Sequence, residues 1–398
     1  MDKFTSWFKK SMMAVAISTV GLAPLGHAQT KPEKFKIGGV ISLSGAYGLL
    51  GEDMRRGVQI AIEERGGKVL GVPIDMVWED DETKPQPAVQ KATKLISEGS
   101  HMIFGALSSA STLAIMNITK QRKIPHLITI SADDKITVPG GSRYAFRTSN
   151  NLDMENRMAL VYAQEKGLKK IYAVTADYQA TRDGWEWVKK EATQKGMKIV
   201  GEDFPAFGNR DYSSIVDKIA KSDADGVILM LTGSDVVTFL KQAGQVNLSK
   251  GKVIFGPVAA DETMAAAVGT TAMGVNTGLR YHYTIDNAAN RKFVEAYQKK
   301  FGALPAMAAG EAYDGMAWWL DTVEKTGSWD KEKWVDAFAN STRENSVEGK
   351  KTMRACDHQA LQVGFWGEVV KGTAPAPALT MKITKVFPEA KLFTDCKS

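Results

Sequence analysis

The sequence predicts an α/β protein built from two lobes, each a doubly wound parallel sheet covered by helices. Short apolar, β-rich runs alternate with amphipathic segments of helical spacing, which is the pattern of βαβ units. The alternation restarts after Asn150, and no segment rich in proline, glycine and serine separates the halves. We therefore expect two lobes of roughly 100–200 residues each, joined by several ordered crossovers.

The first half of the chain carries three strand–helix pairs and a further strand. Apolar runs bounded by turn residues predict the strands, and apolar residues repeating near every 3.6 positions predict the helices. We expect strands at residues 35–43, 74–78, 102–105 and 126–130, and helices at 52–64, 87–96 and 111–123. Such a succession implies a parallel sheet.

The second half repeats this pattern and then adds two helices. We expect strands at 171–175, 199–204, 226–231 and 253–255, and helices at 154–166, 182–195, 212–221, 235–245, 290–301 and 310–326. The last helix carries Trp318, Trp319 and Leu320 as a bulky apolar face. Such a face is typical of a protein core rather than of a ligand-binding surface.

The N-terminus has the pattern of a secretory signal peptide. Lys3, Lys9 and Lys10 precede an apolar run over residues 12–25, and Gly-His-Ala28 provides small residues at a cleavage site. The run is too short and too interrupted for a spanning helix, which needs about 20 apolar residues. We expect residues 1–28 to be removed from an exported protein.

The charge of the chain is mild. The formal net charge is +6, and removal of residues 1–28 takes away three lysines and Asp2, a net of +2, which leaves about +4. Basic residues are interleaved with acids, and no Lys/Arg block with neighbouring aromatics occurs. This pattern argues against nucleic acid as a partner.

Two cysteines, Cys356 and Cys396, remain after removal of the signal. In an oxidising compartment an even pair tends to join, so we expect a disulfide. The alternative is a metal site that includes His358, but no second histidine or further cysteine stands at ligand spacing. We expect no metal.

The sequence lacks the common catalytic motifs. It contains no His-Glu-x-x-His, Gly-x-Ser-x-Gly, Cys-x-x-Cys or phosphate-binding Gly-x-x-x-x-Gly-Lys-Ser/Thr. Its histidines are isolated, as expected of structural residues. We therefore expect neither an enzyme nor a cofactor.

Several segments along the mature chain resemble the type I periplasmic binding proteins, specifically the branched-chain amino acid (leucine/isoleucine/valine) group. The segments that carry the resemblance are residues 35–45, Gly51 with Gly57 and Ala61, and residues 80–85, 105–114, 233–243 and 312–316. The resemblance implies two lobes joined by three crossovers. Residues 29–152 and 281–345 would form the N-terminal lobe, and residues 153–280 and 346–398 the C-terminal lobe.

The resemblance also implies a function. A monomer in the periplasm would capture a small carboxylate, a hydrophobic or branched-chain amino acid in the first instance, in a cleft that closes by hinge rotation. It would deliver this ligand to the membrane permease of an ABC importer. The alternatives are an aromatic or keto acid, an amide or urea as ligand, or a sensory receptor of the same fold.

The strongest candidate for a carboxylate anchor is the N-terminus of the helix near residue 109. Free N–H groups and the helix dipole favour an anion there, and the resemblance places the carboxylate-binding serine at Ser109, with Ser108 and Ser111 as substitutes. Simple helix capping is the alternative. The resemblance also assigns ligand contacts to the backbone of Ile130, Ser131 and Ala132, which ordinary turn roles would equally explain.

The resemblance places an ammonium-binding carboxylate at Asp235, although an acid in a first helical turn also complements the helix dipole. Leu50, Tyr178, Tyr212 and Tyr283 are candidate walls of the ligand pocket, with core packing as the alternative. Thr181 stands where the group has a tyrosine. This difference widens or polarises one wall.

Overall fold

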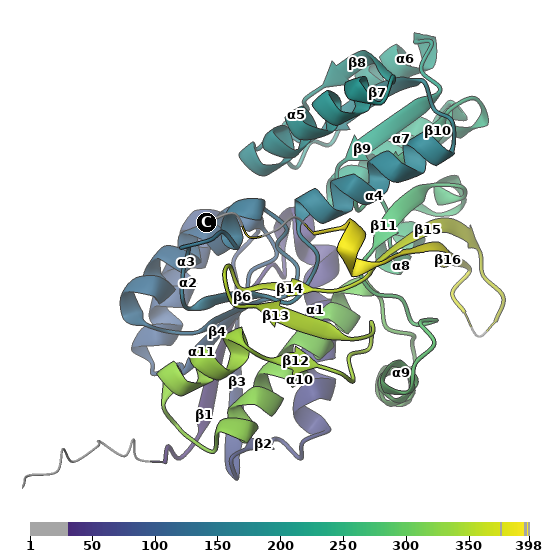
Figure 1. The fold of residues 1–398 in the computed structure, drawn as a ribbon. Helices are drawn as coiled ribbons and strands as arrows, with labels where there is room; N and C mark the ends of the chain where they lie inside the picture. Colours follow the sequence, from purple (N-terminus) through teal and green to yellow (C-terminus); the bar gives the residue numbers. More distant parts are fainter. Residues whose placement is uncertain (1–30, 375, 394–395, 397–398) are drawn as a thin grey trace, which may run out of the picture.

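The computed structural model describes residues 31–374, 376–393 and 396, which form two helix-covered sheets in two lobes (Figure 1). The predicted α/β class with two doubly wound, mostly parallel sheets is confirmed. The predicted signal peptide, residues 1–28, lies outside the described residues. No helix within those ranges combines the length and the hydropathy that crossing a membrane requires.

The first sheet has nine strands in the order β12-β13-β14-β6-β5-β4-β1-β3-β2. Its parallel strands are β1 (Phe35–Ile41), β3 (Val72–Asp80), β4 (Met102–Gly105), β5 (His126–Ile128) and β6 (Ala145–Arg147). The short β2 (Lys68–Val69) pairs antiparallel with β3. Because β1 lies between β3 and β4, it is buried, which explains its apolar sequence.

The α-helices described in this lobe are α1 (Gly48–Glu63), α2 (Pro85–Ser97), α3 (Ser109–Arg122), α9 (Ala288–Phe301), α10 (Met307–Thr326) and α11 (Lys331–Ala339), of which α9 packs against α1. The helices α1 and α10 approach closely at Gly57. A Cβ atom at this position would lie 2.1 Å from the carbonyl oxygen of Ala309. Glycine therefore permits the contact between the two helices.

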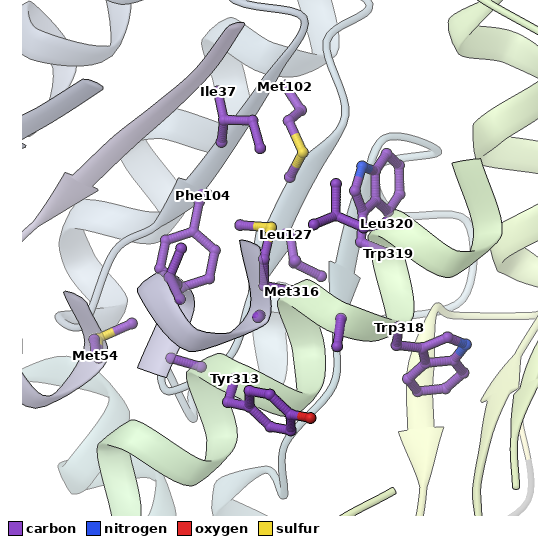
Figure 2. Close-up of a cluster of buried hydrophobic side chains, with 14 of the residues drawn as sticks. Ile37, Met54, Met102, Phe104, Leu127, Tyr313, Met316, Trp318, Trp319 and Leu320 are labelled. Atoms are coloured by element: carbon purple, nitrogen blue, oxygen red, sulfur yellow. The ribbon is translucent and has the colours of Figure 1, made fainter. Parts of the chain in front are cut away.

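The bulky face of α10 lies in the core of this lobe, as predicted. Trp318, Trp319 and Leu320 are buried, and Figure 2 shows them with Met102, Leu127 and Phe104 from the adjoining strands. These residues therefore hold α10 against the sheet and do not form a ligand site.

The second sheet has the order β16-β15-β11-β10-β9-β7-β8. Its parallel strands are β7 (Lys170–Thr175), β8 (Lys198–Asp203), β9 (Gly226–Met230), β10 (Val253–Gly256) and β11 (Asn276–Leu279), and β15 (Gly364–Lys371) and β16 (Leu379–Phe387) extend it antiparallel. Its helices are α4 (Leu152–Glu165), α5 (Gln179–Gln194), α6 (Ser213–Lys221), α7 (Ser234–Gln245) and α8 (Glu262–Val268).

The chain passes between the sheets three times, after β6, after β11 and after β14, as the resemblance implied. The third passage differs from the expected boundary at residue 345. The strands β12 (Thr342–Arg343), β13 (Lys351–Arg354) and β14 (Gln359–Leu361) all belong to the first sheet. The physical reason is that buried Arg147 on β6 donates to the Gln359 side chain at 2.6 Å, which keeps β14 beside β6.

The predicted disulfide between Cys356 and Cys396 is present. Cys356 lies in the turn between β13 and β14 of the first sheet, whereas Cys396 follows β16 of the second. Just before it, Leu392 packs into the core of the second lobe. The disulfide therefore ties the two lobes together near the third crossover.

His358, the histidine of the alternative metal site, stacks on Phe146 with ring centroids 4.2 Å apart.

Candidate functional site

A cavity lies between the two lobes, and its empty space of about 730 Å³ includes solvent at its opening. Its wall includes residues that follow strands of both sheets, the first turns of α4 and α5, and the crossover residue Arg280. The carboxyl ends of strands in doubly wound sheets are the usual place for a ligand.

The structure brings six of the eleven predicted ligand-site residues to the wall of this cavity: Leu50, Ser109, Ile130, Ala132, Tyr178 and Thr181. The other five, Ser108, Ser131, Tyr212, Asp235 and Tyr283, do not line it. Tyr212 is buried in the second lobe against Phe239. Tyr283 bonds through its hydroxyl to Thr380, in a separate depression beside β15 and β16.

The N-terminus of α3 faces the cavity through Ser109. The N-cap residue is Ser108, and its side chain makes no capping hydrogen bond. The Ser109 hydroxyl accepts a hydrogen bond from the Asp133 N–H at 3.2 Å, so it also retains a proton to donate. This end of the cavity combines the helix dipole with a hydroxyl and therefore favours a negatively charged group.

Ser131 has a different place from the one predicted. Its hydroxyl lies 2.8 Å from the carbonyl oxygen of Ala106 and 2.9 Å from that of Leu107. The side chain is fully buried and links the chain after β5 to the chain after β4. It supports the wall from behind, while Ile130 and Ala132 line the cavity.

Arg280 and Glu155 form a buried ion pair in the cavity wall that sequence reasoning missed. Arg280 donates through Nε to Glu155 Oε1 and through Nη1 to the carbonyl oxygen of Ile130. Its Nη2 has no hydrogen-bond partner among the described residues. Burial raises the pKa of Glu155 above its usual value, although the Arg280 charge opposes this effect.

No local signal in the sequence marks this pair. Arg280 is a single arginine just after β11, and Glu155 resembles any acid in a first helical turn. The two residues are 125 positions apart. Only the second crossover, which carries Arg280 past the start of α4, brings them together.

Aromatic side chains form another part of the wall. Phe207 lies edge-on to Tyr47 of the first lobe and to Tyr178 of the second, with centroid distances of 5.4 Å and 5.2 Å. All three line the cavity. Together with Leu50 and Met230 they give this part of the cavity a mainly apolar surface, which suits a hydrophobic group.

Asp235 lies outside the cavity wall. One carboxylate oxygen accepts from the Gly208 N–H at 3.0 Å, and Oδ1 has no partner within the described part of the chain. Burial raises the pKa of Asp235 to about 6. The side chain therefore holds the loop that carries Phe207 and does not meet the cavity directly.

Known proteins are similar to this chain over most of its length. A family model described as "periplasmic binding protein" matches residues 34–374. The Leu/Ile/Val-binding protein homolog 6 of Brucella melitensis is 28% identical over 324 residues, which cover 79% of this chain and 82% of that protein. A leucine-, isoleucine-, valine-, threonine- and alanine-binding protein of Pseudomonas aeruginosa is 25% identical over 348 residues, which cover 86% of this chain and 91% of that protein.

Among solved structures, the chain resembles an ABC-transporter solute-binding protein from R. palustris in complex with benzoate. The TM-score is 0.82 at 27% identity, and the match covers 89% of this chain and 97% of the other.

Proposed function

The chain belongs to the periplasmic binding protein family, and from this premise we propose that it captures a small carboxylate with a hydrophobic side chain for an ABC importer. A hydrophobic amino acid is the first candidate. The observation that carries the proposal is the lining of the cavity, which combines the anion-favouring groups of Ser109 and Arg280 with a mainly apolar and aromatic surface. A carboxylate at one end of a hydrophobic body matches both.

The partners and the cellular location follow from the same role. We expect the signal peptide, residues 1–28, to direct export to the periplasm, and the mature protein to act as a monomer that docks on a membrane permease. The two lobes would correspond to the two sheets, with the third boundary after β14 rather than at residue 345.

An aromatic acid is the second candidate ligand. The three edge-on rings of Tyr47, Tyr178 and Phe207 favour it, because aromatic pairs gain about 0.5–1.5 kcal/mol beyond their buried area. The benzoate bound to the R. palustris relative supports the same candidate.

Thermal unfolding of the purified mature chain with added compounds tests the proposal. Leucine, isoleucine, valine and phenylalanine are compared with benzoate, 4-methyl-2-oxopentanoate, acetamide and urea. At 100 times its dissociation constant a ligand adds about 2.7 kcal/mol to stability, so we expect a clear rise in melting temperature with hydrophobic amino acids. A rise confined to urea and acetamide would contradict a carboxylate ligand.

Closure of the cleft provides a second test, at Gly233. This residue of the second lobe has φ +60°, and a Cβ atom on it would lie 2.4 Å from the carbonyl oxygen of Ala46 in the first lobe. Overpacking costs about 1–3 kcal/mol, so Gly233→Ala should weaken ligand binding roughly 5- to 150-fold, measured by titration calorimetry with the best ligand of the thermal screen.

Gly269→Ala is the matched control for Gly233→Ala. Gly269 also lies in the second lobe and has φ +83°, but a Cβ atom there meets nothing within 4 Å. The variant Gly269→Ala therefore introduces backbone strain without a new contact across the cleft. Equal affinities for the two variants would show that the Gly233 contact plays no part in binding.

A further inference from the structure

Glu155 has an unusual environment for an acid in the first turn of a helix. Such residues usually lie in solvent and interact with the helix dipole. Glu155 is only 1% exposed and lines the cavity between the lobes. Its position follows from the capping of α4, in which the Asn151 side chain accepts from the Met154 N–H at 2.9 Å. The cap fixes the helix start, and Glu155 projects from it into the wall.

The two oxygens of this carboxylate differ. Oε1 accepts from Arg280 Nε, whereas Oε2 is buried and has no hydrogen-bond partner among the described residues. A buried acceptor without a partner costs about 1–3 kcal/mol, and more when it is charged. A ligand that donates a hydrogen bond to Oε2 would remove this cost. Glu155 is therefore a ready acceptor for a cationic donor in the cavity.

The neighbouring donor is equally available. Arg280 is 4% exposed. Its Nε donates to Glu155 and its Nη1 to Ile130, whereas its Nη2 has no hydrogen-bond partner in the described part of the chain. One ion pair thus offers the cavity both an unused donor and an unused acceptor. An α-amino acid carries its carboxylate and ammonium groups on the same carbon atom, so it needs these two partners side by side.

We propose that Glu155, rather than Asp235, binds the ammonium group of an α-amino acid, while Arg280 and Ser109 face its carboxylate. This inference rests on the proposed function and names its substrate class. Arg280 and Glu155 together carry no net charge, and neither does a zwitterion, so binding adds no net charge to the buried cavity. A carboxylate without an ammonium group would leave Oε2 unpaired and place a net negative charge beside it.

The experiment compares amino acids with analogues that lack only the ammonium group. The pairs are leucine with 4-methylpentanoate and phenylalanine with 3-phenylpropanoate, measured by titration calorimetry on the mature chain. In the wild-type protein each amino acid should bind at least about 10-fold more tightly than its analogue, since a hydrogen bond to a charged group contributes about 1.5–3 kcal/mol. A wild-type protein that prefers the analogues would overturn the inference without any mutation.

The variant Glu155→Gln then assigns the preference to this residue. Glutamine keeps an oxygen that accepts from Arg280 Nε, but it has no negative charge and presents its amide NH₂ in place of Oε2. We expect amino acids to lose roughly 10- to 100-fold in affinity, and the analogues to change less than about 3-fold. Equal losses for both members of each pair would show that Glu155 only positions Arg280.

Asp235→Asn is the matched control, because it removes an equally buried charge while it keeps an acceptor for the Gly208 N–H. It should leave the ratio of amino acid to analogue affinity unchanged, and a selective loss of amino acids in this variant would transfer the role to Asp235. If the wild-type protein bound neither these compounds nor any other carboxylate of the thermal screen, the proposed function itself would fail. That result is distinct from carboxylate binding without amino acid preference, which would refute only the role of Glu155.

Discussion

Replacement of Lys351 by methionine is expected to lower the free energy of unfolding by about 3–5 kcal/mol, the usual result of removing one partner from a buried ionic network. The Lys351 ammonium lies 2.6 Å from Glu348, 3.3 Å from Asp314 and 3.7 Å from Glu311, and all four side chains are buried. Methionine fills a similar volume but leaves the carboxylates without this cation.

The same lysine connects three parts of the first lobe. Its ammonium donates to the carbonyl oxygen of Thr148 at 3.0 Å, at the first crossover, while Glu311 and Asp314 belong to α10. Asp314 keeps Arg343 as a second cation at 2.6 Å. Replacement of the lysine therefore leaves mainly the carboxylates of Glu311 and Glu348 without a cation.

Chemical denaturation of the wild-type and variant chains measures this loss, with the neighbouring Lys350→Met as control. Lys350 pairs with Glu344 at 2.9 Å on the surface, where both side chains are more than 60% exposed. Exposed pairs contribute about 0–1 kcal/mol, so the control should stay close to the wild type. Similar losses in both variants would contradict the importance of the buried network.

The loss in Lys351→Met should also depend on pH. Burial already raises the pKa of Glu311 to about 7 and raises the pKa of Glu348 above its usual value, while Lys351 opposes both effects. Without the lysine the folded-state pKa values rise further, so the folded state binds more protons than the unfolded one. Stability of the variant relative to wild type then falls as pH rises, and the deficit should be smaller near pH 5 than near pH 8. A deficit independent of pH would contradict this account.

The second large effect is expected from loss of the disulfide. Cys356 and Cys396 are separated by 40 positions, and in the chain-entropy model closure of such a loop contributes roughly 4 kcal/mol. The double variant Cys356→Ser/Cys396→Ser should therefore unfold at a markedly lower guanidinium concentration than the oxidised wild type.

Two comparisons control for effects of the serines themselves. The reduced wild-type protein should lose as much stability as the double variant, and the double variant should not respond to a reductant. Because the bond joins the turn before β14 to the segment after β16, the loss should affect both lobes. If the double variant unfolded at the same guanidinium midpoint as the oxidised wild type, the disulfide would have no stabilising role.

Most strands and helices up to α10 were predictable because they depend on local periodicity, whereas the short elements β2, β6, α8 and β11 were not predicted. The bulky face of Trp318, Trp319 and Leu320 was correctly assigned to the core by the same rule. The C-terminal strands were not predicted, and β13 and β14 fell in the wrong lobe. Their place depends on the pairing of Gln359 with Arg147, a contact across 212 positions of the chain.

The sequence by itself determined the α/β class, the two lobes, the cysteine pair and the position of Ser109 at a helix N-terminus. All of these follow from short-range patterns or from residue type. Only the tertiary structure decided that Arg280 and Glu155 meet in the cavity wall and that Asp235 does not reach it. The reason is that the place of a buried charged group depends on the partner that compensates its charge. Here the partners lie in distant segments of the chain, which a crossover brings together.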